Sequence, residues 1–326
     1  SNSEVSALAE AAVLARDLIN TPPNVLGPNA FEVRIREFAR DRSMQVSAIA
    51  GDDLLAANFP MIHAVGRASA EAPRLLDLAW GRAGAPKITL VGKGVTFDTG
   101  GLDIKSATGM LLMKKDMGGA ANILGLAHAI ISARLNVRLR VLLPVVENAI
   151  SAASFRPGDI LPSRAGLHVE IGNTDAEGRL ILADALALAS EDQPQLILDM
   201  ATLTGAARVA LGPDLPPVYS NNDRLATDLV AAGATWGDPL WHMPLWAGYA
   251  DDLSSKVADI NHVASGGFAG SITAALFLRR FVQCDADWAH CDIYGWTPAA
   301  RAGRPQGGAD QAIRASYQVI KDRFGI

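Results

Sequence analysis

The stretch "NTDAEGRLILADALALASEDQPQLILDMATLTGA", residues 173–206, decides the fold because it places a helix directly before a strand. Apolar residues recur at helical spacing over 176–191, which predicts a helix. The run "QLILDMAT", 195–202, is short and almost entirely apolar, as is typical of a strand covered on both faces. A helix followed by a buried strand is the repeating unit of an α/β protein.

The same alternation continues on both sides of this unit. Further strands are expected at 74–80, 87–92, 138–146 and 167–172. Further helices are expected at 118–135, 272–283 and 309–324. We therefore predict an α/β fold with a central mixed, largely parallel sheet flanked by helices on both faces, in a single domain over 1–326.

The residues that precede the first of these strands, 1–73, are expected to form a helical lead-in and not a separate domain. A helix over 5–20 should stop at the prolines that follow it. Asn29 is expected to cap a second helix over 30–41. The run 51–69 is expected to be a short helix followed by an exposed loop.

Composition excludes several classes of protein. The chain has 326 residues, 49% of them hydrophobic and 19% charged, which is an ordinary globular balance. The net charge of −5 and the lack of Lys/Arg-rich runs argue against a nucleic-acid or anionic-membrane binder. Two cysteines, Cys284 and Cys291, are too few for a disulfide scaffold. These observations, with no apolar run long enough to span a bilayer, favour a cytoplasmic protein.

Asp98 opens the tripeptide Asp-Thr-Gly, which carries the catalytic carboxylate of aspartic proteases. That mechanism needs two carboxylates that share a proton, whereas this chain contains the element once. The signatures H-E-x-x-H, G-x-x-x-x-G-K-[ST] and G-x-S-x-G are absent from the sequence. Two interpretations of Asp98 therefore remain: a metal ligand, or a turn residue before glycines.

Four acids lie in glycine-rich surroundings: Asp98, Asp116, Asp175 and Glu177. Each alone fits a turn or the start of a helix. Each also adjoins a predicted strand and precedes a helix or a glycine turn, so all four are expected to converge at one end of the sheet. Convergent carboxylates need neutralising charge, and two divalent cations would balance four of them. An oxygen-rich set without histidine suits a hydrolytic two-metal centre.

Three basic residues fit the same site. Lys105 and Arg179 can supply positive charge to an oxyanion that develops on a carbonyl, or can simply pair with neighbouring acids. Lys93, flanked by glycines, is either a second cation near the acids or, when deprotonated, a nitrogen ligand.

Several motifs together resemble the leucyl aminopeptidase family, the cytosol aminopeptidases, which are dinuclear metallo-exopeptidases. The resemblance runs from about Arg16 to the end of the chain. The octapeptide "NTDAEGRL", 173–180, is its most specific element. The other motifs are "VGKGVTFDTGGLDIK", "MLLMKKDMGGAAN", "VENAISAASFRPGDIL", "DMATLTGA", "WAHCDIYGW" and "AGRPQGGADQAI".

The resemblance implies a role for each acid and for Lys93. Lys93, Asp98 and Asp116 match the ligands of the tighter metal site. Asp175 and Glu177 match the ligands of the more exchangeable site, and Asp98 and Glu177 are expected to bridge both ions. The implied cofactors are two divalent ions per subunit, Mn²⁺ or Zn²⁺.

The resemblance also implies catalytic and substrate-binding residues. Lys105 matches the lysine that polarises the scissile carbonyl, and Arg179 matches the arginine that holds a bicarbonate ion or water acting as a proton shuttle. The residues matching the substrate wall and pocket are Met113, Thr202, Leu203 and Gly205.

The implied activity is removal of an N-terminal residue, preferably leucine or a similar apolar one, from peptides by a hydroxide bound to the two metals. A non-catalytic binding or scaffold protein, or a metal-dependent hydrolase of a non-peptide amide, remains as an alternative. The family's usual N-terminal α/β domain is not found in this chain, which begins at what resembles the connecting helix. A homohexamer built as a dimer of trimers is expected.

Overall fold

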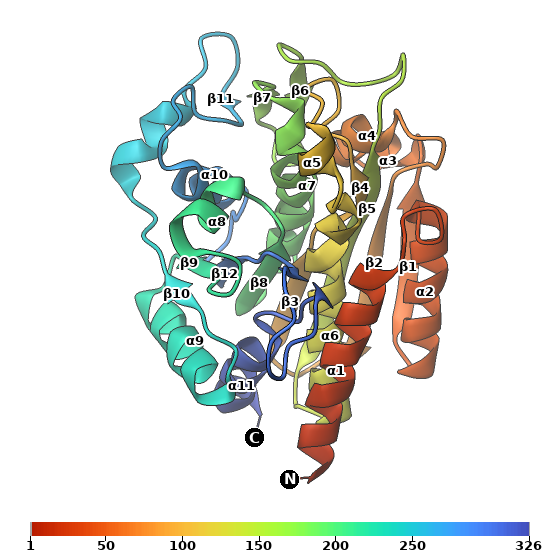
Figure 1. Cartoon of the computed structure of the whole chain (residues 1–326), viewed down its shortest axis with the longest axis vertical. Helices are drawn as coiled ribbons and strands as arrows, with labels where there is room; N and C mark the ends of the chain where they lie inside the picture. The colour runs from red at the N-terminus through yellow and green to blue at the C-terminus, as the bar shows by residue number, and fades with distance from the viewer. Residues whose placement is uncertain (1, 326) are drawn as a thin grey trace.

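A nine-stranded mixed sheet forms the centre of the computed structural model, which describes residues 2–325 (Figure 1). The strand order is β1-β2-β5-β3-β8-β12-β9-β10, and β4 also pairs with β5. The strands are β1 (Gln45–Ala50), β2 (Arg74–Gly81), β3 (Lys87–Gly92), β4 (Gly94–Asp98), β5 (Arg138–Asn148), β8 (Leu196–Ala201), β9 (Pro217–Ser220), β10 (Trp241–His242) and β12 (Asp287–Asp292).

The middle of the sheet is parallel and its flanks contain the antiparallel pairs. β3 lies parallel to β5 and β8, and β8 lies parallel to β12. The pairs β1–β2, β2–β5 and β9–β12 are antiparallel. Along β8, Leu198 packs into one core cluster while Ile197 packs into the other. Burial on both faces explains the unbroken apolar runs of the central strands and confirms the predicted fold class.

Helices cover both faces of the sheet. One core cluster joins the sheet to α1 (Asn2–Asn20), α2 (Pro28–Asp41), α6 (Gly118–Ser132), α9 (Asp223–Trp236) and α11 (Ile313–Phe324). The other joins it to α3 (Asp53–Ala56), α4 (Pro60–Gly66), α7 (Glu177–Glu191) and α10 (Gly270–Arg279). In Figure 1, α1 and α6 lie side by side. Within residues 2–325, no helix is long and apolar enough to cross a membrane.

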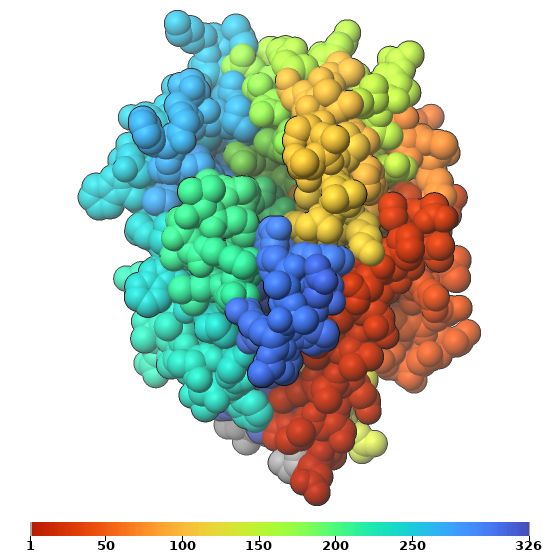
Figure 2. All heavy atoms as spheres, in the orientation of Figure 1, coloured from red at the N-terminus to blue at the C-terminus, as the bar shows by residue number. Residues whose placement is uncertain are grey.

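Short elements complete the fold. They are α5 (Ala107–Met110), η1 (Met113–Met117), η2 (Thr174–Ala176), α8 (Gly205–Leu211), η3 (Ala247–Leu253), β6 (Ile160–Pro162), β7 (His168–Glu170), β11 (Ile260–Asn261), β13 (Trp296–Thr297) and β14 (Gly307–Gly308). Figure 2 shows atoms of the yellow segment around α5 and of the green segment around α8 facing each other across a hollow. The pocket described below opens between these segments.

One predicted strand belongs to a different sheet. The run 167–172 does form a strand, β7, but β7 pairs with β6 and β11 in a separate three-stranded sheet. The prediction that it joins the central sheet is therefore wrong. An alternating apolar pattern indicates an extended, half-buried chain but carries no information on which strand will be its partner.

The lead-in, 1–73, also differs from the prediction. It is helical in α1 and α2, but β1 lies inside it and forms the edge of the main sheet. Asn29 does not cap α2, which begins at Pro28; its side-chain oxygen instead accepts a hydrogen bond of 2.5 Å from Arg74 Nη2. The expected exposed loop after α3 is a second helix, α4, whose apolar residues are buried.

Candidate metal centre

Four acids predicted from the sequence reach one site from four elements. Asp98 ends β4, Asp116 lies in η1, Asp175 lies in η2 and Glu177 begins α7. One carboxylate oxygen from each of Asp98, Asp175 and Glu177 lies within 4.8 Å of the others, which is close enough for one cation to touch all three. The predicted convergence of these three residues is confirmed by the geometry.

The aspartate at the end of β4 is held by the turn that follows it. Asp98 Oδ1 accepts hydrogen bonds of 2.8 Å from the backbone N–H of Gly100 and from Asn148 Nδ2. Gly100 and Gly101 have φ values of +90° and +66°, a region that favours glycine, so the turn depends on the glycine pair. Asn148 ends β5 and was missed in the sequence, since only strand pairing brings it beside Asp98.

Lys93 lies between two of the acids and is almost completely buried, with 3% of its surface exposed. Its Nζ is 2.8 Å from Asp116 Oδ2 and 2.9 Å from Glu177 Oε1, and it donates a hydrogen bond of 3.0 Å to the carbonyl of Thr202. A Cβ at Gly178 would lie 2.5 Å from Lys93 Cε. The glycine after Glu177 therefore makes room for this lysine side chain.

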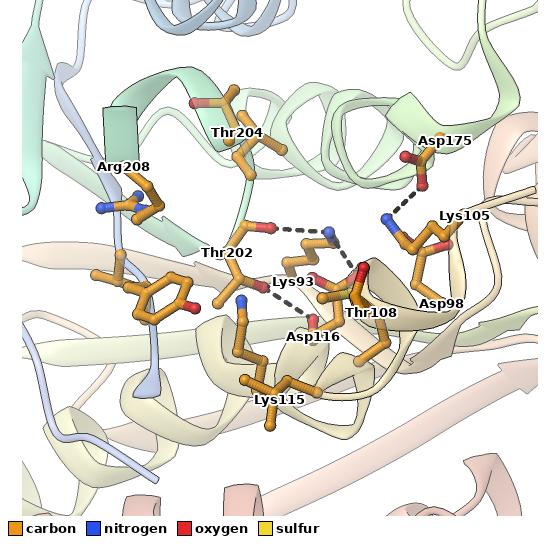
Figure 3. A pocket seen from close by; sticks show the side chains of 17 residues that line it. Lys93, Asp98, Lys105, Thr108, Lys115, Asp116, Asp175, Thr202, Thr204 and Arg208 are labelled. Carbon is orange, nitrogen blue, oxygen red and sulfur yellow. Dashed lines mark hydrogen bonds and ion pairs between the residues drawn. The ribbon is translucent and has the colours of Figure 1, made fainter. Parts of the chain in front are cut away.

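Lys105 bridges the two acids on the other side of the site. Its Nζ lies 2.8 Å from Asp98 Oδ2 and 2.5 Å from Asp175 Oδ1. Figure 3 shows Lys105 and Asp175 pointing toward each other across the pocket wall. Asp98 therefore meets a lysine ammonium through Oδ2 and neutral donors through Oδ1.

The electrostatics of the acids reflect their crowding. Burial, reinforced by the charge of Asp98, raises the pKa of Glu177 well above its usual value. Burial and the charge of Asp116 raise the pKa of Asp98 to about 6. Burial also favours the neutral form of Asp116, but Lys93 and Lys115 outweigh it and lower its pKa. Without a cation, the fold thus resists ionisation of part of its own carboxylate set.

The donor atoms of the site fit a divalent cation. Within the described chain, three buried carboxylate oxygens have no hydrogen-bond donor in bonding geometry: Asp116 Oδ2, Asp175 Oδ1 and Glu177 Oε1. Each lies 2.5–2.9 Å from a lysine ammonium, with which it forms an ion pair. Buried carboxylate oxygens of this kind are the ligands that hard divalent cations prefer.

Arg179 lies behind the site and not in the pocket wall. It is 7% exposed, and its Nη1 donates a hydrogen bond of 2.7 Å to the carbonyl of His262. Its Nε has no hydrogen-bond partner among the described residues. Burial lowers the pKa of Arg179 to about 10. The guanidinium therefore keeps one donor available in the interior.

A pocket of about 360 Å³ opens over the acids (Figure 3). Seventeen residues line it: Lys93, Asp98, Lys105, Thr108, Gly109, Leu112, Met113, Lys115, Asp116, Asp175, Thr202, Leu203, Thr204, Gly205, Arg208, Ile293 and Tyr294. All four residues predicted as substrate wall or pocket are in this set, whereas Glu177 and Arg179 are not. Sequence reasoning missed Lys115, Arg208 and Tyr294, which no motif singled out.

One buried carboxylate shapes the pocket wall that follows β8. Asp292 accepts hydrogen bonds from the backbone N–H groups of Leu203, at 3.0 Å, and Thr204, at 3.3 Å. It also accepts a hydrogen bond of 2.6 Å from Thr204 Oγ1 and one of 2.8 Å from Arg208 Nη2. Asp292, at the end of β12, thereby holds the segment between β8 and α8 in place.

The fold and this site define a class: an α/β protein whose pocket holds a buried set of carboxylates and lysines suited to divalent cations. Comparison with known proteins gives the family. The chain belongs to the cytosol aminopeptidase family, whose catalytic-domain model matches residues 13–315.

Proteins similar in sequence to this chain are named as probable cytosol aminopeptidases. The chain is 43% identical over 321 residues to a probable cytosol aminopeptidase of Roseiflexus castenholzii, covering 97% of this chain and 65% of the relative. It is 44% identical over 319 residues to the one of Syntrophotalea carbinolica, covering 96% and 64%. The chain thus spans a little less than two thirds of the length of these curated relatives.

Two solved structures share the fold closely. The cytosol aminopeptidase from Coxiella burnetii superposes with a TM-score of 0.96 at 50% identity, covering 99% of this chain and 70% of that one. The bottromycin maturation enzyme BotP in complex with Mn superposes with a TM-score of 0.94 at 38% identity, covering 98% and 71%.

Proposed function

We propose that this chain is the catalytic domain of a metal-dependent aminopeptidase that removes an N-terminal residue from peptides. The observation that carries the proposal is the convergence of Asp98, Asp175 and Glu177 beside Lys105, where Asp98, Asp175 and Lys105 line an open pocket. The names of the relatives support it, and so does the Mn complex of BotP.

The proposed metal ligands are Lys93, Asp98, Asp116, Asp175 and Glu177. The close spacing of carboxylate oxygens from Asp98, Asp175 and Glu177 supports this assignment, because carboxylate oxygens are the ligands that hard divalent cations prefer. Lys93 would have to lose its proton to act as a ligand. Here Asp116 and Glu177, each within 3 Å of Nζ, outweigh burial and raise the pKa of Lys93. Bound divalent cations, Mn²⁺ or Zn²⁺, would supply Lewis acidity and a more acidic water molecule.

Lys105 is proposed as the group that stabilises negative charge on the scissile carbonyl oxygen. It lines the pocket, and Asp98 and Asp175 hold its ammonium at the edge of the acid cluster. Although burial opposes it, the charge of Asp98 raises the pKa of Lys105, so the side chain is a cation at neutral pH. A fixed cation aimed at a developing oxyanion is worth most in the transition state.

The wall from Thr202 to Gly205 is proposed to orient the peptide backbone, and Met113 to contact the N-terminal side chain. All of them line the pocket. Apolar lining residues such as Leu112 and Leu203 support acceptance of leucine and similar side chains. The unpartnered Nε of Arg179 supports its proposed role in holding a bicarbonate ion or water near the site.

The remaining proposals concern organisation. We propose that residues 1–326 form one catalytic domain, because β1 of the lead-in pairs with the main sheet. A homohexamer arranged as a dimer of trimers and a cytoplasmic location also stay predictions. Light scattering of the purified protein would test the hexamer.

The test of the activity is a titration of the purified protein with Mn²⁺ or Zn²⁺ while hydrolysis of leucine amide is measured. Turnover that appears with added metal and disappears on chelation is the expected result. No turnover at any metal concentration would contradict the aminopeptidase and favour a binding protein. Turnover of non-peptide amides alone would instead indicate a different hydrolase.

A further inference from the structure

One end of the pocket contains two cationic side chains that have no role in the proposed reaction. Lys115 Nζ lies 4.5 Å from the centre of the Tyr294 ring, and the guanidinium carbon of Arg208 lies 5.7 Å from the same centre. All three residues line the pocket. Figure 3 shows Lys115 and Arg208 on the side of the pocket away from Lys105 and Asp175.

Lys115 differs from the other two lysines of the pocket in its partners. Lys93 and Lys105 each lie within ion-pair distance of two carboxylates. Among residues 2–325, no carboxylate oxygen is recorded within 4.0 Å of Lys115 Nζ, although the residue is only 6% exposed. A buried ammonium is costly unless an anion or hydrogen-bond acceptors compensate it. The aromatic ring of Tyr294 supplies part of that compensation and no full counter-charge.

Arg208 lies at the same end of the pocket. Its Nη2 is engaged by the side chain and the backbone carbonyl of Asp292. Its Nη1 is buried and has no hydrogen-bond partner within the described part of the chain. Buried guanidinium N–H groups are rarely left unpaired, because each carries a desolvation cost. Lys115 therefore offers a charge at this end of the pocket, and Arg208 adds a second cationic side chain to the lining.

The pocket thus has carboxylates at one end and, at the other, a lysine with no carboxylate recorded within 4.0 Å among residues 2–325, beside the Arg208–Asp292 ion pair. A cavity of about 360 Å³ has room for an amino-acid residue. A ligand that matches this charge pattern carries an amine toward Asp98 and Asp175 and an anionic group toward Lys115. We propose that Lys115, with Arg208 and Tyr294 beside it, forms a subsite that binds a carboxylate of the peptide substrate. This inference rests on the proposed aminopeptidase function and specifies its substrates.

Two parts of a peptide can supply that carboxylate. One is the side chain of an N-terminal glutamate or aspartate; the other is the free C-terminus of a dipeptide. The chemistry of recognition is the same in both cases, a charge-assisted hydrogen bond to a carboxylate oxygen. The experiment therefore has one arm for each source.

The first arm compares α-glutamyl and α-glutaminyl p-nitroanilides, which differ in charge and hardly in size. The wild-type protein with Mn²⁺ should prefer the glutamyl substrate by roughly tenfold in kcat/KM. In Lys115→Met the ratio should fall to about one, because the variant keeps the length of the side chain and removes its charge. The matched control is Lys114→Met: Lys114 Nζ donates to the carbonyl of Asn20 outside the pocket lining, so the ratio should stay at its wild-type value.

The second arm compares Leu-Leu with Leu-Leu amide. A preference for the free carboxylate that disappears in Lys115→Met would assign the subsite to the C-terminus of a dipeptide. A glutamyl preference that disappears would assign it to the N-terminal side chain. If neither ratio depends on Lys115, the subsite does not exist and the inference is overturned.

A binding measurement separates failure of this inference from failure of the proposed activity. Titration calorimetry with glutamate and with glutamine needs no turnover, and the two ligands differ only at the side-chain end. Tighter binding of glutamate that is lost in Lys115→Met would support the subsite even in a protein that hydrolyses nothing. Equal binding of both amino acids, together with no Lys115-dependent preference for Leu-Leu over Leu-Leu amide but with metal-dependent hydrolysis of leucine amide, would overturn the subsite and retain the aminopeptidase.

Discussion

Asp184, in the middle of α7, accepts the backbone N–H of Met61 at 2.9 Å, so that its carboxylate caps the amino end of α4. The same carboxylate accepts the N–H of Ile62 at 3.3 Å and that of Arg164 at 2.9 Å. Three backbone donors from two distant segments thus converge on one fully buried side chain. The lead-in is tied by this contact to the helix that begins with Glu177.

Substitution of Asp184 should therefore destabilise the whole protein. Asp184→Ala leaves three N–H groups without an acceptor, and we expect the free energy of unfolding to fall by about 3 kcal/mol. Urea denaturation followed by circular dichroism measures this change. The control is Asp251→Ala, whose side chain is exposed and whose effect should stay within about 0.5 kcal/mol. A loss for Asp184→Ala as small as that of the control would show that the cap contributes nothing.

The sequence predicts the central strands well because burial on both faces requires apolar residues along nearly the whole strand. β3 and β8 are apolar along almost their whole length, since each lies between two parallel neighbours and beneath helices on both sides. β12, "DWAHCD", was missed because it holds buried polar groups. Its His290 lies 2.5 Å from Asp199 Oδ1, and Asp292 is satisfied by Arg208 and Thr204. Such pairs join residues distant in the sequence, across strands or from strand to helix, and give no periodic signal.

One missed element did carry a signal. α9 begins after Asn222, whose side chain accepts hydrogen bonds from the N–H groups of Arg224 and Leu225. An asparagine before a segment with apolar residues at helical spacing is a recognised start of a helix. α9 was therefore predictable from the sequence, whereas the pairing of β7 with β6 and β11 was not.

In the site, the acids were predictable because each lies in a glycine-rich motif next to an expected strand or helix. The cationic end of the pocket was not, because it depends on three distant segments: Lys115 in η1, Arg208 in α8 and Tyr294 after β12. A single lysine, arginine or tyrosine forms no sequence pattern from which a shared pocket could be predicted. Only the tertiary arrangement shows that, of the three lysines that line the pocket, Lys115 has no carboxylate partner within residues 2–325.

Glu177→Gln should remove activity while leaving the fold intact. The side chain is 1% exposed and its carboxylate crowds that of Asp98, so loss of its charge relieves repulsion in the metal-free protein. We expect the free energy of unfolding without metal to change by less than about 1 kcal/mol, and Mn²⁺ binding and leucine amide hydrolysis to be lost. Calorimetry and a turnover assay measure these effects. Glu191→Gln, at the exposed end of the same helix, is the control and should retain both. Activity near wild type in Glu177→Gln would remove this residue from the metal site.

Lys105→Ala should lower kcat by about a hundredfold with a much smaller change in KM, because a cation facing a developing oxyanion acts mainly in the transition state. Steady-state kinetics at saturating Mn²⁺ measure both constants. Lys105→Arg keeps the charge and should recover part of the rate. Lys256→Ala, at an exposed position, should behave as wild type. An effect of Lys105→Ala confined to KM would instead assign this lysine to substrate binding alone.

Metal affinity should depend on pH through the carboxylates of the site. Burial and the charge of Asp116 raise the pKa of Asp98 to about 6 in the metal-free protein, above the value of about 3.9 expected for an unfolded chain. Between these two values the folded state binds more protons than the unfolded state, so the stability of the metal-free protein should fall as pH rises from about 4 to about 6. Mn²⁺ must displace that proton as well as the proton of Lys93, so its affinity should change in the opposite sense and weaken by at least about tenfold for each pH unit below about 6. Calorimetric titrations at pH 5, 6 and 7, in buffers of different ionisation enthalpy, would report both the affinity and the protons released. An affinity that is the same at pH 5 and pH 7, with no proton release, would mean that Asp98 does not bind the metal.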